Sequence, residues 1–133
     1  MQWKMTTDYA LSALIYLTAK GEMANAAEIA EEMDIPQNFL YTVMGKMRKA
    51  GIVSVERGVT GGWRLAVDPK DVQVRDVLDL FGDDILYERT LEDEKACASM
   101  EKYAPATYRK ISDYNQNLRS YLHGLTLSDL CAR

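Results

Sequence analysis

The chain has 133 residues, of which 47% are hydrophobic and 27% are charged, and its formal net charge is −4. This length is enough for one ordinary core with an appendage, which argues against a large enzyme. No apolar run approaches the roughly 18 residues of a membrane span, and the first eight residues lack the apolar stretch of a signal peptide, so we expect a cytoplasmic protein without a membrane partner.

Two helices are predicted near the start of the chain. Residues 7–20 place apolar side chains at three- and four-residue spacing on one stripe, and Gly21 supplies a natural stop. Asn25 has the form of a helix cap with Glu28 as its reciprocal partner, and it opens a short helix that ends near Met33. Both helices have one apolar face, so we expect both to pack on a shared core.

A third helix, over about 36–50, has two different faces. Pro36 cannot continue the second helix but suits the first turn of a new one. The apolar stripe of this helix is Phe39, Leu40, Val43, Met44 and Met47. Its open side is polar and basic and consists of Gln37, Asn38, Tyr41, Thr42, Lys46 and Arg48. Two short helices joined by a tight turn are typical of a helix-turn-helix. In that motif, polar and basic side chains on the open side of the second helix bond to base edges. The alternative is that this side of the helix is simply exposed to solvent.

A β-hairpin is predicted directly after this helix pair, over residues 52–67. Residues 52–55 and 63–67 are β-rich runs, and the six residues from Arg57 to Gly62 hold three glycines, which suit a tip with positive φ and close backbone approach. We expect Trp63 to pack rather than to intercalate. The hairpin is therefore a candidate wing, and its predicted DNA contacts are Arg57, Thr60, Gly61, Gly62 and Arg64.

Charge is distributed unevenly along the chain. Residues 36–67 hold five basic side chains and one acidic side chain, a balance of +4, whereas residues 68–101 hold eleven acidic and four basic side chains, a balance of −7. Phosphate contacts require cations only on the contacting face. The first segment can therefore face DNA, and the second cannot.

The remainder of the chain is predicted to be two helices separated by an acidic stretch. An amphipathic helix is expected over about 73–81, and residues 83–94 are expected to form an exposed loop or a weak helix. A helix of about four turns, over 107–122, carries a narrow apolar seam of Tyr108, Ile111, Tyr114 or Asn115, Leu118, Tyr121 and Leu122. The seam can fold back on its own domain or pair with a second copy, and we favour the pair because it also spaces two recognition helices along DNA.

Three stretches together resemble the Rrf2 family of bacterial regulators, to which proteins of the IscR, NsrR and CymR kind belong. They are residues 7–11, residues 40–66 and residues 122–130, and the most specific part is the Lys-Ala-Gly turn at 49–51 followed by the Arg-Gly and Gly-Gly-Trp motifs at 57–58 and 61–63. The resemblance covers nearly the whole chain. It implies a homodimer that binds double-stranded DNA, usually to repress transcription, with the long helix crossing to the partner.

The expected fold is thus mainly α with a small β-hairpin wing: a winged helix-turn-helix and a long C-terminal dimerisation helix. We expect a DNA-binding domain over 1–81, an acidic connector over 82–101, and the dimerisation helix with the C-terminal segment over 102–133. The predicted dimer contacts are Tyr108, Ile111, Leu118, Tyr121 and Leu122.

The resemblance also raises the question of an iron–sulfur cluster. Cluster-binding members of the family use three closely spaced cysteines between the wing and the long helix, whereas this chain has only Cys97 there and Cys131 in the tail. Asp8 matches a position from which some relatives supply a carboxylate, but it also suits a helix start, and we favour the helix start. We therefore expect reduced thiols and no conventional cluster. Regulation by a small molecule, by a protein partner or by oxidation of Cys97 stays open.

Two other functions compete with DNA binding. The chain has one histidine, no recognisable catalytic pair and no phosphate-binding glycine loop, so we do not expect an enzyme. A winged helix that serves only as a protein-interaction module is the second alternative. It predicts neither a steep salt dependence nor a preferred DNA site, whereas a DNA regulator predicts both.

Overall fold

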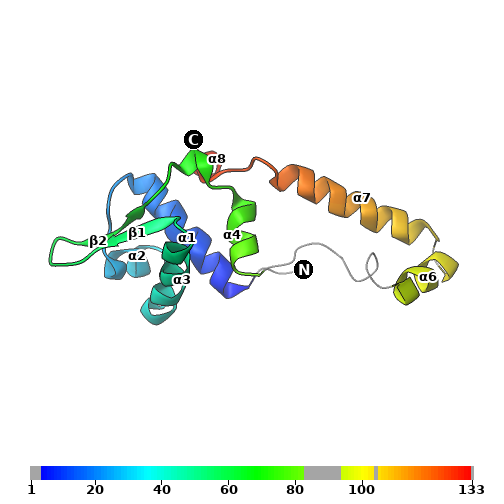
Figure 1. Cartoon of the computed structure of the whole chain (residues 1–133), viewed down its shortest axis with the longest axis horizontal. Helices are drawn as coiled ribbons and strands as arrows, with labels where there is room; N and C mark the ends of the chain where they lie inside the picture. The colour runs from blue at the N-terminus through cyan, green and yellow to red at the C-terminus, as the bar shows by residue number, and fades with distance from the viewer. Residues whose placement is uncertain (1–3, 83–93, 104, 133) are drawn as a thin grey trace.

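A computed structural model describes residues 4–82, 94–103 and 105–132 (Figure 1). The predicted class is confirmed, because the described chain is mostly helical with one two-stranded antiparallel hairpin. None of its described helices is long and apolar enough to cross a membrane. The elements in chain order are α1 (Met5–Lys20), α2 (Ala26–Glu32), α3 (Gln37–Lys49), β1 (Val53–Glu56), β2 (Gly62–Leu65), the 3-10 turn η1 (Pro69–Asp71), α4 (Val74–Leu80), α6 (Glu94–Tyr103), α7 (Pro105–Leu122) and α8 (Leu127–Cys131).

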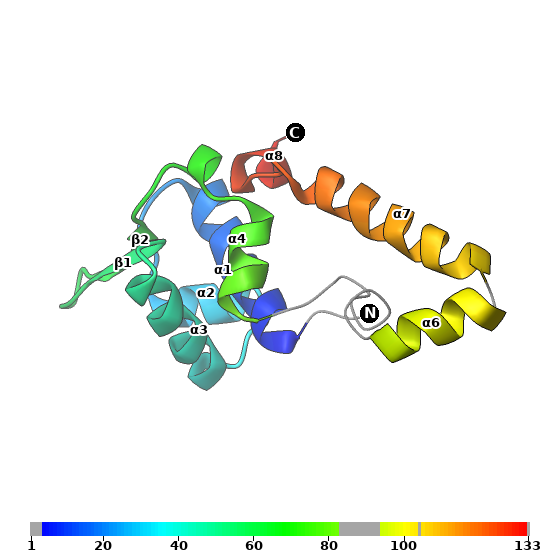
Figure 2. The same ribbon diagram turned by 45° about the vertical axis from the view of Figure 1, so that its right-hand side comes forward.

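These elements form two parts, which we call the head and the arm. The head comprises residues 4–82 and 123–132, and the arm comprises α6 and α7. In Figures 1 and 2 the arm extends from one end of the head, and the β-hairpin projects from the opposite end. The chain leaves the head after α4 and returns to it through α8, so the arm is an excursion from a single core.

The head is built around α1, which packs against α3, α4 and α8. Its apolar stripe is fully buried, as the spacing of those residues predicts. The predicted stop is confirmed, because Gly21 adopts a left-handed conformation (φ 74°) and its N–H donates to the Leu17 carbonyl. The predicted cap of α2 is confirmed, since the Asn25 side chain accepts a hydrogen bond of 2.8 Å from the Glu28 N–H. The predicted reciprocal role of Glu28 is not, because its carboxylate accepts hydrogen bonds from Tyr16 and Lys20 instead.

A tight turn joins α2 to α3 and completes the helix-turn-helix. Asp34 has a positive φ of 52°, and the Ile35 N–H donates to the Ala30 carbonyl, which directs the chain away from α2. Ile35 itself is buried in the core. Pro36 caps α3, and Gly51 follows it with a φ of 80°, so this helix has nearly the predicted bounds.

The hairpin is tied to the head through its second strand. β1 and β2 pair from Val53 with Leu65 to Glu56 with Gly62. Trp63 also exchanges two backbone hydrogen bonds with Ala24, of 2.7 and 2.9 Å, and its ring is buried, which confirms the expected packing role. The wing is therefore a rigid extension of the core and not a loose loop.

Two helices of the structure have no counterpart among the predicted elements. α6 covers residues 94–101 at the end of the stretch assigned to an acidic connector, and α8 lies beyond the long helix. α8 packs on the head: Leu127 is fully buried, and its N–H donates to the Val72 carbonyl at 2.9 Å. The loop or weak helix expected at 83–94 lies, except for its last residue, outside the described residues, and the three-part domain division stays a prediction.

Candidate nucleic-acid interface

The apolar face of α3 is buried and its polar face is exposed, as the sequence predicts, with one exception. Leu40, Val43, Met44 and Met47 are buried in the head. Phe39 was expected in the same stripe and is instead about half exposed, so that assignment is wrong. Its ring lies 5.9 Å from the ring of Tyr9 on α1, at the edge of the core. Every polar residue predicted on the open side is exposed: Gln37, Asn38, Tyr41, Thr42, Lys46 and Arg48.

The N-terminal half of the open face carries neutral hydrogen-bonding groups. The Gln37 amide donates to the Tyr41 hydroxyl at 3.2 Å, one helical turn away, which aligns these two side chains. The Thr42 hydroxyl donates to the Asn38 carbonyl at 3.2 Å and is thus engaged by its own helix, whereas the Asn38 amide is exposed. Amide and hydroxyl groups at the start of a recognition helix are suited to base edges.

The C-terminal half carries cations instead. Lys46, Arg48 and Lys49 lie in the last turns, and α3 contains no acidic residue. The Lys46 ammonium lies 5.2 Å from the centre of the Phe81 ring, a cation–π contact that anchors its stem toward the end of α4. Lys49 is exposed on the same open face but was absent from the predicted contacts. Its spacing of four residues from Gly45 and seven from Thr42 would have placed it there.

The wing presents a second group of exposed polar residues. Arg57 and Thr60 are exposed beside the tip, where Val59 projects fully into solvent. Arg64 is exposed too, but its guanidinium forms a salt bridge of 2.9 Å with the Glu56 carboxylate across the hairpin. Both partners are about half exposed, so the pair is weak and a phosphate can compete for the arginine.

Two of the three wing glycines, Gly61 and Gly62, have a structural role that the sequence did not specify. A Cβ on Gly61 would lie 2.1 Å from the Glu56 carbonyl oxygen, and one on Gly62 would lie 2.7 Å from the Ala24 carbonyl oxygen. The close backbone approach that was expected at these glycines is therefore to the chain's own backbone. Gly62 is also buried, so a DNA contact through it stays a prediction.

Acidic side chains border this surface. A hollow beside the end of α3 is lined by Ala50, Gly51 and Val67 and by three aspartates, Asp71, Asp76 and Asp79. These carboxylates would repel a phosphate backbone. The residues predicted to contact DNA lie on α3 and the wing, at the end of the molecule away from the arm in both views (Figures 1 and 2).

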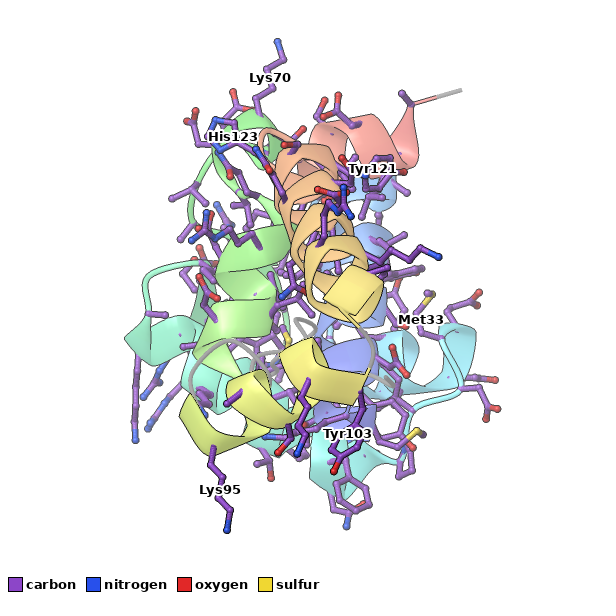
Figure 3. The ribbon with its side chains drawn as sticks, turned by 90° about the vertical axis from the view of Figure 1, so that its right-hand side faces the viewer. Met33, Lys70, Lys95, Tyr103, Tyr121 and His123 are labelled. Atoms are coloured by element: carbon purple, nitrogen blue, oxygen red, sulfur yellow. The ribbon has the colours of Figure 1, made fainter. Side chains whose placement is uncertain are left out.

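The residues predicted for the dimer divide into three kinds. Leu122 is buried in the core of the head and Leu118 packs against that core, so their own chain already accounts for this burial. Tyr121 is 71% exposed on the arm, and Tyr114, the alternative to Asn115 in the seam, is 47% exposed. Tyr103 on α6 is exposed as well (Figure 3). The side chains of Tyr108 and Ile111 lie outside the described residues.

The candidate cluster ligands do not come together among the described residues. Cys97 belongs to α6, and its side chain lies outside the described part of the chain. Cys131 lies on α8, where burial raises the pKa of its thiol and its Sγ lies 3.7 Å from the Ile15 carbonyl oxygen. Asp8 is exposed in the first turn of α1, where the negative charge of a carboxylate interacts favourably with the free backbone N–H groups of the helix. With only two cysteines in the chain, this donor set does not fit an ordinary four-ligand iron–sulfur cluster.

Comparisons with known proteins agree with the fold of this chain. The Rrf2 family model, described as an iron-dependent transcriptional regulator, matches residues 3–133. A protein of Aquifex aeolicus named as an HTH-type transcriptional regulator is 32% identical over 94% of this chain and 88% of its own length. The transcriptional regulator NsrR of Bacillus subtilis is 40% identical over 59% of this chain and 55% of its own length. The solved structure of CymR, the global cysteine regulator of B. subtilis, has the same fold, with a TM-score of 0.81 at 23% identity over 98% of this chain and 96% of that one.

Proposed function

Because the chain belongs to the Rrf2 family, it is a DNA-binding transcription regulator and not an enzyme, and we propose that it acts as a homodimer that represses transcription in the cytoplasm. In this proposal α3 enters the major groove of an operator and the wing contacts the adjacent backbone or minor groove. Two copies then read a near-palindromic site, because the symmetry of the DNA follows that of the dimer.

The observation that carries the proposal is the composition of the open face of α3. Neutral hydrogen-bonding groups occupy its first two turns, and Lys46, Arg48 and Lys49 occupy its last. Base edges are read by groups of the first kind, and phosphates are held by groups of the second. The wing adds Arg57 at the same end of the molecule, so that one surface offers both kinds of contact.

Exposed aromatic side chains on the arm support the homodimer. Tyr114 and Tyr121 lie seven residues apart and therefore on the same face of α7. Tyrosine is enriched at protein interfaces, because it buries a large ring while its hydroxyl keeps a polar partner. A second copy of the arm, related by two-fold symmetry, would cover this face and hold two heads at a fixed separation.

The test is DNA binding by the full chain as a function of salt. Fragments selected from genomic DNA by the wild-type protein serve as probes, and we expect the affinity to fall steeply between about 50 and 200 mM salt. Lys49→Ala and Arg57→Ala should weaken binding to all sequences, whereas the triple variant Gln37→Ala, Asn38→Ala and Tyr41→Ala should relax the preference at particular bases.

A matched control removes a cation outside the proposed surface. Lys110 is exposed on α7, so Lys110→Ala should leave DNA affinity unchanged. Equal losses in the Lys110 and Lys49 variants would show that total charge and not this surface governs binding. A wild-type protein that selects no DNA and shows no salt dependence would favour the protein-interaction module instead.

A further inference from the structure

Gly45 is a glycine in the interior of α3 whose presence the head does not explain. It lies nine residues into a 13-residue helix, and it is not among the glycines with a positive φ. Apart from the adjoining backbone of α3 itself, a Cβ at this position would meet no atom of the described chain within 4 Å. Glycine is, after proline, the least favourable residue in a helix interior, so an alanine here should stabilise the fold.

The other glycines show what a structural requirement looks like. Five of the eight glycines, all within the described chain, have a positive φ, and Gly61 and Gly62 lie too close to backbone atoms to carry a side chain. Gly45 meets neither condition. A helix-destabilising residue with no reason inside its own chain points to a reason outside it.

The surroundings of Gly45 indicate what approaches it. On the helix surface its neighbours are Tyr41 and Thr42 one turn before, and Arg48 and Lys49 one turn after. All four are exposed, and the Thr42 hydroxyl is held by its own helix. The missing side chain therefore leaves a dip on the open face that is bordered by a phenol and two cations, which suits an anionic, bulky group.

The position of the dip along α3 indicates which part of the DNA this anionic group belongs to. Gly45 lies eight residues beyond Gln37, about 12 Å along the helix axis. The major groove is also about 12 Å wide. When the start of α3 reaches the base edges, Gly45 therefore comes level with a strand at the rim of the groove and not with the bases.

We propose that Gly45 is the point at which one sugar–phosphate strand of the operator comes into van der Waals contact with α3, with Arg48 and Lys49 on the adjoining phosphates. This inference rests on the proposed function and adds a steric requirement to it. A side chain at position 45 lifts the helix off the strand and weakens all of its contacts together, whatever the base sequence.

The test compares Gly45→Ala and Gly45→Leu with the wild type, using the genomic fragment that the wild-type protein selects. Gly45→Ala should raise the melting temperature by about 2–6 °C and weaken DNA binding at least about tenfold, which corresponds to 1.4 kcal/mol. Leucine has a helix propensity close to that of alanine but a larger side chain, so a further loss with Gly45→Leu identifies a steric cause. On single-base variants of the fragment, Gly45→Ala should lose affinity relative to the wild-type protein by the same factor as on the original fragment.

Three results would overturn the proposal: unchanged affinity in both variants, a lower melting temperature for Gly45→Ala, or a loss restricted to particular base changes. In each case wild-type binding to the fragment would stand, and so would the proposed function. Ser120→Ala, which favours helix on an exposed site of α7 off the tyrosine face, serves as the control for a stabilising change away from both proposed interfaces and should bind DNA like the wild type.

Discussion

The head and the arm differ in how far each buries its own apolar surface. The described head combines α1 with seven further elements and has one continuous core. On the arm, the buried side chains that the structure describes are Asn115 and Leu122, with Leu118 partly buried, and all three lie in the half of α7 nearer the head. Described side chains toward α6, such as Tyr103 and Arg109, are exposed (Figure 3). The described head therefore buries its apolar surface in its own core, whereas the described part of the arm keeps exposed aromatic side chains that the proposed dimer would cover.

The largest effect should come from the point where the chain rejoins the head. Leu127 is fully buried although it lies more than 40 residues after α4. Leu127→Ala should lower the free energy of unfolding by about 2–5 kcal/mol, because a buried leucine leaves a cavity. Chemical denaturation measures the loss. Leu130→Ala, at a 42% exposed site of the same helix, is the control. Similar values for both variants would mean that α8 is not part of the core.

The C-terminal helix also shows where prediction from the sequence failed. The helix-turn-helix and the wing follow from long apolar stripes, Pro36, Gly51 and a glycine-rich tip, which are local signals. α8 has only five residues, too few for a periodic stripe. Its signal was the capping box of Thr126 and Asp129, whose side chains and backbone N–H groups bond reciprocally at 3.2 and 2.9 Å.

The candidate site was predicted in outline but not in its contacts. Helical spacing gave the open face of α3, because faces depend on local periodicity. It did not give the position of Phe39 at the core edge, the pairing of Arg64 with Glu56, or the stacking of Lys46 on Phe81, since each depends on a neighbour from another element or strand. α6 was missed because the acidic composition around it outweighed its amphipathic pattern.

The second prediction concerns the joint between the wing and the head. Gly62→Ala places a Cβ against the Ala24 backbone, which has no flexible end to move aside. We expect the unfolding free energy to fall by about 1–3 kcal/mol through overpacking. Val59→Ala, at the fully exposed wing tip, should change stability by less than about 0.5 kcal/mol. If Gly62→Ala were equally harmless, the wing would be attached more loosely than its hydrogen bonds indicate.

The third prediction concerns the arm, where we expect substitutions to change dimer association and not the stability of the head. The double variant Tyr114→Lys, Tyr121→Lys should leave the unfolding of the head unchanged, because both side chains lie on the arm, where Tyr121 is largely exposed and Tyr114 about half exposed in a single chain. It should raise the dissociation constant of the dimer at least about tenfold, or 1.4 kcal/mol, since two like-charged pairs would face each other across the two-fold axis. Sedimentation at several concentrations measures the association.

A matched control for the arm uses the opposite side of α7. Gln116 is exposed there, and Gln116→Lys adds a positive charge without entering the tyrosine face. We expect it to associate like the wild type. Dissociation by both variants would indicate a general charge effect, and dissociation by neither would place the interface elsewhere.

The smallest effect should come from a polar contact inside the head, between α1 and the start of α2. The hydrogen bond from Lys20, and then the 2.6 Å hydrogen bond from the Tyr16 hydroxyl, lower the pKa of Glu28 below its ordinary value of 4.5. Because the pKa is lower in the folded chain, this contact stabilises the head above about pH 4.5 and is lost as the pH falls through the folded value.

At pH 7, Glu28→Gln should reduce the unfolding free energy by about 0.2–1 kcal/mol, as is usual for pairs with partial access to solvent. The wild type and this variant should converge in urea unfolding as the pH falls below the lowered pKa of folded Glu28, where Glu28 is protonated in both states. Glu31→Gln, on an exposed site of the same helix, should not show this pH-dependent convergence, and if it did, the acid sensitivity would belong to the overall charge of α2 and not to the contact that joins it to α1.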